Sequence, residues 1–403
     1  SARCERDLAL IWSWKFNWLV NGRLKKDDWV MGEKLRVGVI FGGRSGEHEV
    51  SLMSARSVLE ALNPQRYQVM EIGITLAGEW RVAPPGSPVS VLQAFQEANV
   101  AALVPATILP DPSRPGLYAL LDASRGWEFL SGLDVVFPVL HGTFGEDGTL
   151  QGLLEMVDVA YIGAGVLGSS LGMDKGVFQA VMRAHNIPVV ETLVFLRGEL
   201  QADLQGVMAR AEQVAPYPLF IKPANLGSSV GVSKVLNHSD LYEGLLEAAR
   251  YDRRILVQRG VNAREIEVAV LGNDDPQASV PGEILPSREF YSYEAKYVDN
   301  ASGLLIPAPI PAETAALVRS LAVRAYQAID CAGMARVDFL LDKDSGELFL
   351  NEVNTIPGFT SISMYAKLWN ATGIAYPELV DRLIALAIAR KTERDQTERK
   401  YER

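Results

Sequence analysis

The alternation of apolar and polar residues toward the end of the chain predicts a β-hairpin within residues 336–360. Side chains of a strand point alternately to its two faces, so Arg336 and Asp338 share one face of the first strand. By the same rule, Glu352 and Asn354 share one face of the second strand. If the two faces coincide, one surface presents two carboxylates, one carboxamide and one guanidinium.

The register of this hairpin decides whether these polar groups meet. A loop with an odd number of residues would pair Asp338 with Glu352, and residues 344–346 with Gly346 left-handed would form such a loop. An even loop would pair Asp338 with Asn351 and separate the groups. Hard oxygen ligands without Cys or His suit Mg²⁺. The alternative interpretation is an ordinary hairpin with a solvated polar face.

The first half of the chain has the pattern of an α/β domain. Residues 35–41 form an apolar run that leads into a glycine turn, and helical apolar spacing begins at Ser51. Residues 69–74 and 135–139 predict further parallel strands. Residues 83–115 are rich in proline and small residues, which favours a surface insertion. We therefore expect a Rossmann-like N-terminal domain built on a parallel sheet.

The second half alternates strands and helices in an α+β order. The expected strands lie near 219–222, 255–258 and 266–271, the expected helices near 241–251, 312–329 and 376–391, and a long loop at 281–309. The length predicts several domains. We divide the chain into an extension at 1–30, an N-terminal domain at 31–165, a central subdomain at 166–260 and a C-terminal subdomain at 261–403.

Composition and charge narrow the possible functions. The chain has 403 residues and a mass of 44.1 kDa, and its 48% hydrophobic and 22% charged residues are usual for a globular enzyme. The net charge of −10 argues against nucleic acid as the main partner, although not against nucleotides. Cys4 and Cys331 are the two cysteines, so we expect no disulfide framework and a reducing compartment.

The first thirty residues differ from the rest, because they contain tryptophans at positions 12, 14, 18 and 29. The apolar run at 8–14 is too short to cross a bilayer, and no small-residue cleavage site follows it. Met31 begins a segment just before the first predicted strand, so we interpret 1–30 as an extension. The alternative is a helix that binds a membrane surface or a partner.

A lysine followed by small residues predicts a site for phosphate groups. Lys222 ends a predicted strand and precedes a loop at 225–231, where glycine and serine allow backbone N–H groups to turn toward an anion. The lysine precedes the glycines, so the segment is not a GxxxxGK[ST] loop. An exposed lysine at a hairpin turn is the alternative. Lys175 and the downstream carboxylates favour a nucleotide-triphosphate site.

Six motifs occur in order along residues 34–390. They are GG…EHEVS at 42–51, HGTFGEDG at 141–148, MDK at 173–175, KP…GSSVG at 222–231, YEAKY at 293–297 and NEVNTIPGFT at 351–360. Each motif alone is weak, but the ordered set is specific, and it resembles the D-alanine–D-alanine ligase family of the ATP-grasp superfamily. The resemblance implies a Rossmann-like N-terminal domain followed by a two-part ATP-grasp fold, which combines α/β and α+β architecture.

The resemblance also implies an activity. Such ligases use ATP to phosphorylate the carboxylate of one D-alanine, and the amine of a second D-alanine attacks the acyl phosphate to give D-alanyl-D-alanine for peptidoglycan. It implies ATP and two Mg²⁺ ions, with Mn²⁺ as a substitute. A cytoplasmic homodimer is the family expectation, and we expect neither nucleic acid nor a membrane as a partner.

The motifs imply roles for individual residues. The expected metal ligands are Asp338, Glu352 and Asn354. The expected nucleotide contacts are Lys175, Lys222, Gly227, Ser228, Ser229, Gln258, Arg259, Val261 and Glu265. Arg336, which is charged at any physiological pH, would form the oxyanion hole with the N–H of Gly358. The alternative for Arg336 is a structural partner of Asp338.

The same motifs imply how the amino acids bind. Glu47 would receive the ammonium of the first D-alanine, and the alternative is an acidic residue that interacts with a helix macrodipole. The expected substrate contacts besides Glu47 are His141 beside the first substrate and Lys296 with Ser363 at the carboxylate of the second. Ser228 and Tyr297 would form a hydrogen-bonded chain with Glu47, linking the glycine loop to a lid at 281–309 that excludes water.

Two features concern specificity. Related ligases that make a lactate-ended product lack the Lys296–Tyr297 pair, so this pair favours D-alanine as acceptor, while D-serine stays open. The family usually has Glu-Lys or Glu-Gln where this chain has Gln258-Arg259. A glutamine carbonyl oxygen can still accept from the adenine amino group, so we expect ATP to be used.

Two other functions stay open from the sequence. Another ATP-grasp carboxylate–amine ligase would share Lys222 and the carboxylates but use different acids, and Glu47 and residues 293–297 argue against it. A nucleotide-binding regulatory module without turnover would tolerate loss of Arg336 or Tyr297, and both are present.

Overall fold

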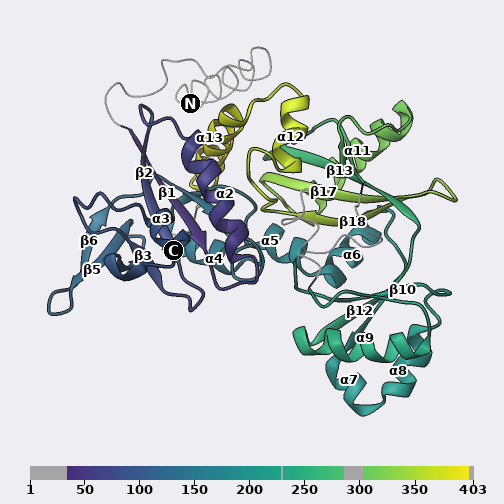
Figure 1. Cartoon of the computed structure of the whole chain (residues 1–403). Helices are drawn as coiled ribbons and strands as arrows, with labels where there is room; N and C mark the ends of the chain where they lie inside the picture. The colour runs from purple at the N-terminus through teal and green to yellow at the C-terminus, as the bar shows by residue number, and fades with distance from the viewer. Residues whose placement is uncertain (1–33, 228–229, 286–302, 399–403) are drawn as a thin grey trace. The chain divides into compact units, whose positions relative to one another are not determined.

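The computed structural model describes residues 34–227, 230–285 and 303–398. The chain divides into two compact units, Ser1–Leu35 and Arg36–Arg403. Apart from the first residue of one strand, the described helices and strands all belong to the second unit, which contains three sheets (Figure 1). Among the helices described, none combines the length and apolarity needed to cross a membrane.

The first sheet has eight strands in the order β6-β5-β4-β3-β2-β1-β7-β8. They are β1 (Leu35–Gly42), β2 (Tyr67–Ile74), β3 (Trp80–Val82), β4 (Val104–Ile108), β5 (Leu117–Asp122), β6 (Gly126–Ser131), β7 (Val135–Val139) and β8 (Ala160–Tyr161). Strands β1, β7 and β8 pair in parallel, which confirms residues 135–139 as a parallel strand, but the sheet as a whole is mixed rather than parallel. From β2 to β6 the pairs are antiparallel.

The interpretation of residues 83–115 as a surface insertion is wrong. This segment contains the helix α3 (Val91–Gln96), a short 3₁₀ turn (Val100–Ala102) and β4, which lies inside the first sheet between β3 and β5. Ala106 and Ile108 are 6% and 2% exposed and belong to the core of this sheet. The prolines and small residues flank β4, which is buried because it pairs with an antiparallel strand on each side.

The second sheet is antiparallel, in the order β11-β10-β12-β9. Its strands are β9 (Thr192–Leu196), β10 (Leu219–Pro223), β11 (Ser233–Val235) and β12 (Arg254–Arg259), and its helices are α7 (Arg197–Ala202), α8 (Leu204–Ala211) and α9 (His238–Tyr251). The three helices cover one face of the sheet, where Val207, Leu241 and Leu245 join its core (Figure 1). The predicted strands at 219–222 and 255–258 and the predicted helix at 241–251 are confirmed.

The third sheet has the order β16-β15-β13-β17-β18, with β14 also paired to β13. Its strands are β13 (Ala263–Gly272), β14 (Gln277–Ala278), β15 (Gly282–Leu285), β16 (Gly303–Leu305), β17 (Gly333–Asp342) and β18 (Leu348–Asn354). The helices α11 (Ala312–Ala328) and α12 (Met364–Ala371) pack on β13. The predicted loop at 281–309 begins and ends as the antiparallel pair β15 and β16.

The β17–β18 hairpin places Asp338 opposite Glu352, but not through an odd loop. Near the turn, Leu341 pairs with Leu348 and Phe339 with Leu350, so the loop is even and the predicted odd loop is wrong. Continued regularly, this register would pair Asp338 with Asn351. A bulge between Asp338 and Phe339 shifts the register by one residue. Gly346 has a φ of +75°, as predicted.

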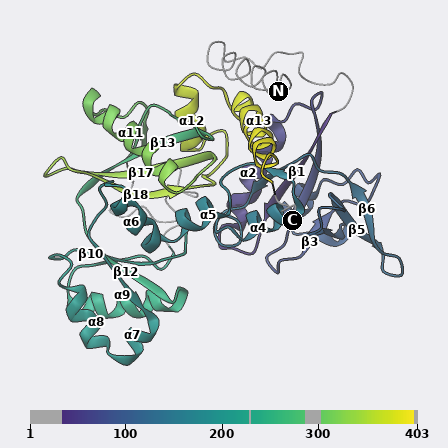
Figure 2. The same ribbon diagram turned by 180° about the vertical axis from the view of Figure 1, so that it is seen from behind.

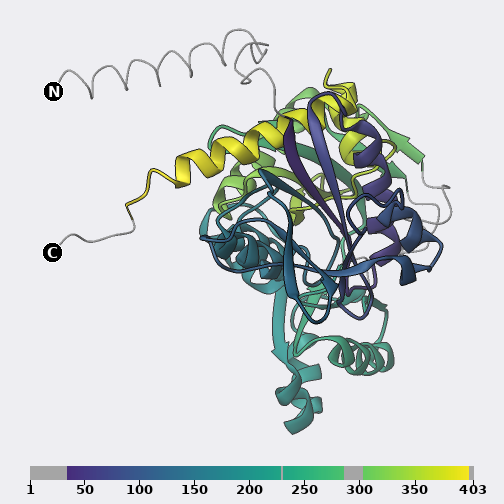
Figure 3. The ribbon, with the colours of Figure 1, turned by 90° about the vertical axis from the view of Figure 1, so that its left-hand side faces the viewer.

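Two helices connect the sheets around the site. The helix α5 (Val166–Met173) contacts α4 (Thr149–Val157), a helix that packs beside the first sheet, and also contacts β18 of the third sheet (Figure 2). The long C-terminal helix α13 (Tyr376–Arg394), drawn in yellow in Figure 3, contacts β7, β8 and β17. Arg390 of α13 donates to the carbonyl oxygens of Tyr161 and Gly163, which fixes this arrangement.

Candidate active site

One cavity of about 1470 Å³ collects the predicted site residues that the structure describes. Its lining includes Glu47, His141, Lys175, Lys222, Gly227, Gln258, Arg259, Val261, Glu265, Arg336, Asp338, Glu352, Asn354, Gly358 and Ser363. Ser228, Ser229, Lys296 and Tyr297 lie outside the described residues, as does most of the predicted lid. The structure therefore brings together groups from all three sheets, and their individual roles stay predictions.

A row of three carboxylates crosses the third sheet at the cavity. Glu267 pairs with Asp338, and Asp338 pairs with Glu352, so their side chains share one face of β13, β17 and β18. The amide nitrogen of Asn354 lies 2.9 Å from an oxygen of Asp338 and 3.5 Å from one of Glu352. The bulge thus produces the cluster that the alternation predicted.

This cluster fits a hard divalent cation held partly by phosphate oxygens. Within the described ranges, no group of three or more His, Cys, Asp or Glu side chains is placed to hold one ion. Mg²⁺ usually takes one or two carboxylates together with waters and substrate phosphates. Asp338 and Glu352 with the Asn354 carbonyl oxygen supply such a donor set, so they would hold the ion when a nucleotide is bound.

Arg336 lies between two carboxylates. Its Nη2 and Nε donate to Asp338 at 2.6 and 2.8 Å, and its Nε lies 3.0 Å from Glu267. Burial alone would lower the pKa of Arg336, but the charges of Asp338 and Glu267 outweigh it and raise the pKa well above its usual value. The guanidinium is therefore charged and fixed in direction.

Glu267 was not among the predicted site residues. Its side chain is 6% exposed and lines the same cavity. The period-2 alternation that links Glu265 with Glu267 could have identified it, because Glu265 was already assigned to this face. Without the tertiary structure, nothing indicated that β13 lies beside β17 or that Glu267 pairs with Asp338.

Glu47 lies at the start of the helix α2 (His48–Ala61) but does not cap it with its side chain. Its carboxylate approaches two glycines, since a Cβ added at Gly142 or Gly227 would lie 2.6 or 2.8 Å from its Oε2. Gly142 also has a φ of +76°, which disfavours other residues. Glu47 is thus packed between two loops at the cavity, which supports more than a macrodipole role.

Glu146 is a second carboxylate in this part of the cavity, and no role was predicted for it. Its Oε2 accepts a hydrogen bond from the N–H of Gly142 at 2.7 Å. Burial and the charge of Glu47 raise the pKa of Glu146 well above its usual value. Glu146 therefore keeps its proton to higher pH than an ordinary glutamate.

We expect the variant Glu146→Gln to become more stable than the parent chain as the pH rises. A carboxyl whose pKa is raised by folding stabilises the native state at low pH, and this contribution is lost between the unfolded pKa, near 4.5, and the raised folded pKa. Glutamine keeps an acceptor for Gly142 and cannot ionise. Melting temperatures from pH 5 to 9 measure this, with exposed Glu243→Gln as control. Parallel curves for Glu146→Gln and the parent would contradict it.

The two lysines approach the cavity from neighbouring elements. Lys175, the first residue of α6 (Lys175–Ala184), donates to the carbonyl oxygen of Leu226 at 2.7 Å and so holds the glycine loop. The Nζ of Lys222 makes a long hydrogen bond of 3.5 Å to the side-chain oxygen of Asn351, which lies at the bulge. Asp174 caps α6 and also bonds to Asn225 at 3.2 Å. The start of the glycine loop is thereby anchored beside both lysines.

The residues expected to contact the adenosine of ATP, Gln258, Arg259 and Glu265, line the cavity. Gln258 is 4% exposed, and its amide nitrogen donates to Thr192 at 3.2 Å. Its carbonyl oxygen is then the atom that could accept from an adenine amino group. Arg259 forms an ion pair with Glu191 at 2.6 Å, and both Arg259 and Glu265 line the cavity. This geometry is compatible with the expectation that Gln258 replaces the usual glutamate.

His141 is held by the protein at both ring nitrogens. Nδ1 lies 3.1 Å from the carbonyl oxygen of Ile356, and Nε2 lies 3.1 Å from the hydroxyl of Ser54. Burial lowers the pKa of His141, and this outweighs the Glu47 carboxylate, which raises it. The ring is neutral and lines the cavity, but its nitrogens serve neighbouring residues. Ser54 was not predicted from the sequence.

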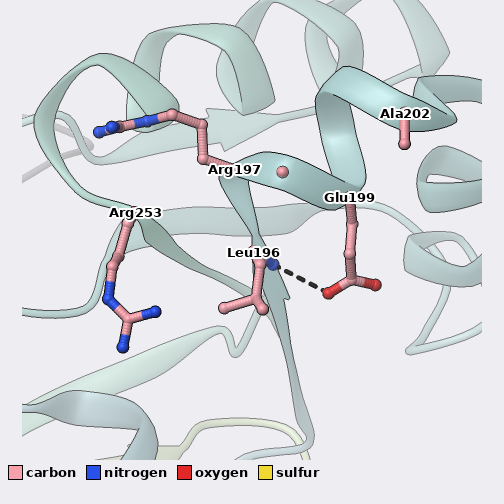
Figure 4. Close-up of a pocket in the computed structure, with 6 residues that line it drawn as sticks. Leu196, Arg197, Glu199, Ala202 and Arg253 are labelled. Carbon is pink, nitrogen blue, oxygen red and sulfur yellow. Dashed lines mark hydrogen bonds between the residues drawn. The ribbon is translucent and has the colours of Figure 1, made fainter.

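A second, smaller pocket of about 540 Å³ lies at the start of α7 (Figure 4). It is lined by Leu196, Arg197, Gly198, Glu199, Ala202 and Arg253. Glu199 there accepts from the N–H of Leu196 at 3.0 Å and pairs with Arg210 at 2.6 Å, and Arg197 donates to a backbone oxygen. These groups are used in local structure, so we assign the pocket no function.

The fold is that of an ATP-grasp ligase, and its cavity contains a row of carboxylates, two lysines beside a glycine loop and a fixed arginine. Two family models match the chain: the D-ala D-ala ligase N-terminus over residues 36–164 and the D-ala D-ala ligase C-terminus over residues 181–385. The chain therefore belongs to the D-alanine–D-alanine ligase family and is an enzyme of this kind.

Individual relatives cover nearly the whole chain. D-alanine–D-alanine ligases from Heliobacterium modesticaldum and Natranaerobius thermophilus are 50% and 46% identical, and the matches cover 91% and 90% of this chain and 98% of each relative. The solved D-alanine–D-alanine ligase of Coxiella burnetii has a TM-score of 0.77 at 35% identity, covering 91% of this chain and 97% of that one. The VanG D-Ala:D-Ser ligase of Enterococcus faecalis has the same TM-score and identity, covering 88% and 100%.

Proposed function

We propose that this enzyme joins two D-alanines to D-alanyl-D-alanine with cleavage of ATP to ADP and phosphate, for peptidoglycan synthesis. The observation that supports this most strongly is the placement of Glu47, Lys222, Arg336 and Gly358 on one cavity with the Asp338–Glu352 cluster. In this proposal the Glu47 carboxylate would bind an ammonium, Lys222 would bind phosphates, and the Arg336 guanidinium would face the carbon that reacts. A small zwitterion and a nucleotide triphosphate satisfy these groups together.

In the first step, a carboxylate oxygen of the first D-alanine attacks the γ-phosphorus of ATP, and ADP leaves. Glu47 would orient the substrate through its ammonium. Lys175 and Lys222 would neutralise the phosphates, and little covalent chemistry is required of the protein. A divalent cation held by Asp338, Glu352 and Asn354 would supply further neutralisation of the phosphate charge.

In the second step, the amine of the second D-alanine attacks the acyl carbon. The carbonyl oxygen becomes an oxyanion in the tetrahedral intermediate, and the C–O bond to phosphate then breaks. Arg336 and the Gly358 N–H would stabilise this oxyanion, since a fixed cation and a fixed dipole require no reorganisation. Ser363 lines the cavity, its hydroxyl donates to the carbonyl oxygen of Thr360 at 2.7 Å, and we expect it to bind the carboxylate of the acceptor.

The proposed acceptor is D-alanine, with D-serine as the nearest alternative. The relatives of highest identity quoted above are named D-alanine–D-alanine ligases, whereas VanG at 35% identity is named a D-Ala:D-Ser ligase. The Lys296–Tyr297 pair supports an amine acceptor. We also propose a cytoplasmic homodimer that uses ATP with Mg²⁺ or Mn²⁺, and these points are extensions of family membership.

Phosphate release from ATP, measured with each amino acid in turn, tests the proposal. We expect release that depends on D-alanine, with D-alanyl-D-alanine identified by mass spectrometry. Dependence on a different acid would favour another carboxylate–amine ligase. Binding of ATP without turnover would favour a regulatory module. If D-alanyl-D-serine forms with a kcat/KM similar to that of D-alanyl-D-alanine, the assignment of D-alanine as the specific acceptor is wrong.

A further inference from the structure

The loop at 356–359, between β18 and α12, presents Gly358 to the cavity. Three side chains from elsewhere in the chain hold it. His141 lies 3.1 Å from the carbonyl oxygen of Ile356, and the N–H of Phe359 donates to the hydroxyl oxygen of Ser54 at 3.3 Å. The hydroxyl of Tyr376 donates to the carbonyl oxygen of Phe359 at 2.7 Å.

Ser54 connects two of these contacts. Its oxygen accepts from the N–H of Phe359, so its own hydrogen can be donated to Nε2 of His141, 3.1 Å away. Nε2 is then the acceptor, and Nδ1 must bear the hydrogen that bonds to Ile356. The hydrogen bonds from Phe359 through Ser54 and His141 to Ile356 therefore run in one consistent direction with a neutral ring.

These contacts use the polar groups on both sides of Gly358 but not its own N–H. No acceptor among the residues that the structure describes is bonded to the N–H of Gly358. The closest atom that a Cβ on Gly358 would meet is the Cβ of Ser363 at 4.0 Å, so the space beside it is open. Gly358 lines the cavity, so we expect its N–H to be available to a bound ligand.

Ser54 also belongs to the helix that positions Glu47. Glu47 precedes the first residue of α2, and Ser54 is two turns further along, with 0% exposure. Glu47 would bind the ammonium end of the first amino acid, whereas Gly358 would bind the oxyanion that forms at its carboxyl carbon. One rigid helix therefore fixes the distance between both ends of the same substrate.

We propose that Ser54 is a positioning residue that holds the Gly358 N–H at the place where the oxyanion develops. This inference rests on the proposed function. The hydroxyl acts through the backbone of the 356–359 loop and through His141, not by contact with the substrate. Loss of the hydroxyl would leave the N–H of Phe359 and Nε2 of His141 without these partners, and the loop would lose its orientation.

The variant Ser54→Ala tests this inference. We expect kcat to fall by about 10- to 100-fold, because a misplaced oxyanion donor costs transition-state stabilisation, with the KM for ATP within about threefold of the parent. Ser57→Ala is the matched control, since Ser57 lies on the same helix, is only half-buried, and makes one long bond to Met53 at 3.5 Å. It should have the parent's kcat.

Three results would overturn the role of Ser54. They are an unchanged kcat, an equal loss of kcat in Ser57→Ala, and a slower rate that saturating ATP restores, which would indicate a higher KM for ATP. If Ser54→Ala is recovered poorly, Ser54→Cys keeps the volume with a weak donor and acceptor, and the same fall in kcat is expected at a native melting temperature. A parent chain without D-alanine-dependent phosphate release would instead refute the proposed function.

Discussion

Replacing Arg336 with lysine is expected to lower kcat by about 100- to 1000-fold while the affinity for ADP stays within about threefold. Lysine keeps the positive charge between Asp338 and Glu267 but loses the planar fork that now donates to Asp338 at 2.6 and 2.8 Å. The oxyanion would then meet a mobile point charge. Phosphate release gives kcat, and titration calorimetry gives the affinity for ADP.

Arg264→Lys is the matched control for this substitution. Arg264 also makes a two-pronged pair, with Glu283 at 2.7 and 2.6 Å, but it does not line the cavity. Loss of the two-pronged pair in Arg264→Lys should lower the melting temperature and leave kcat nearly unchanged. Equal kcat values for Arg336→Lys and the parent would remove Arg336 from the oxyanion hole. Arg336→Ala is less informative, because two buried carboxylates without their cation destabilise the fold by about 3–5 kcal/mol.

The second large effect is expected for Glu352→Gln. This change removes one negative charge from the row with Asp338 and leaves the side-chain volume nearly constant. Because loss of an outer partner of a metal site alone costs about 10- to 100-fold in affinity, loss of a direct ligand should raise the Mg²⁺ concentration for half-maximal rate by more than about 100-fold. Binding of Mn²⁺ in the presence of ADP, followed by electron paramagnetic resonance, measures the same loss without turnover.

Glu347→Gln is the control on the same hairpin. Glu347 is exposed beside the turn, and its side chain contacts the hydroxyl of Ser345 at 3.4 Å. We expect its Mn²⁺ affinity and kcat to match the parent. If Glu352→Gln binds Mn²⁺ as tightly as Glu347→Gln does, the metal assignment for the Asp338–Glu352 cluster is wrong and the row has a structural role.

The residues of the site could be predicted where a motif surrounds them. Lys222, Glu352 and Gly358 each belong to a short segment whose chemistry is visible in the sequence, and the structure places all three on one cavity. Ser54 has no such segment. Its partner Phe359 is 305 positions away, so its hydrogen bond depends on how two distant parts of the chain fold together.

The hairpin shows the same division at short range. Alternation assigned Asp338 and Glu352 to polar faces, and that assignment holds on both sides of the bulge. The number of loop residues did not follow from alternation, because a bulge adds one residue and changes the register without a clear signal in composition. The prediction of a surface insertion at 83–115 was wrong for a related reason, since the burial of β4 depends on its neighbours β3 and β5.

The sequence by itself determined most helices and strands and the set of chemical groups available for catalysis. These properties depend on backbone geometry and residue chemistry within a few positions. Only the tertiary structure decided that Glu267 lies beside Asp338, that burial and the charge of Glu47 raise the pKa of Glu146, and that burial lowers the pKa of His141. Each of these depends on desolvation and partners from other elements, and a side chain acquires both only when the sheets pack around the cavity.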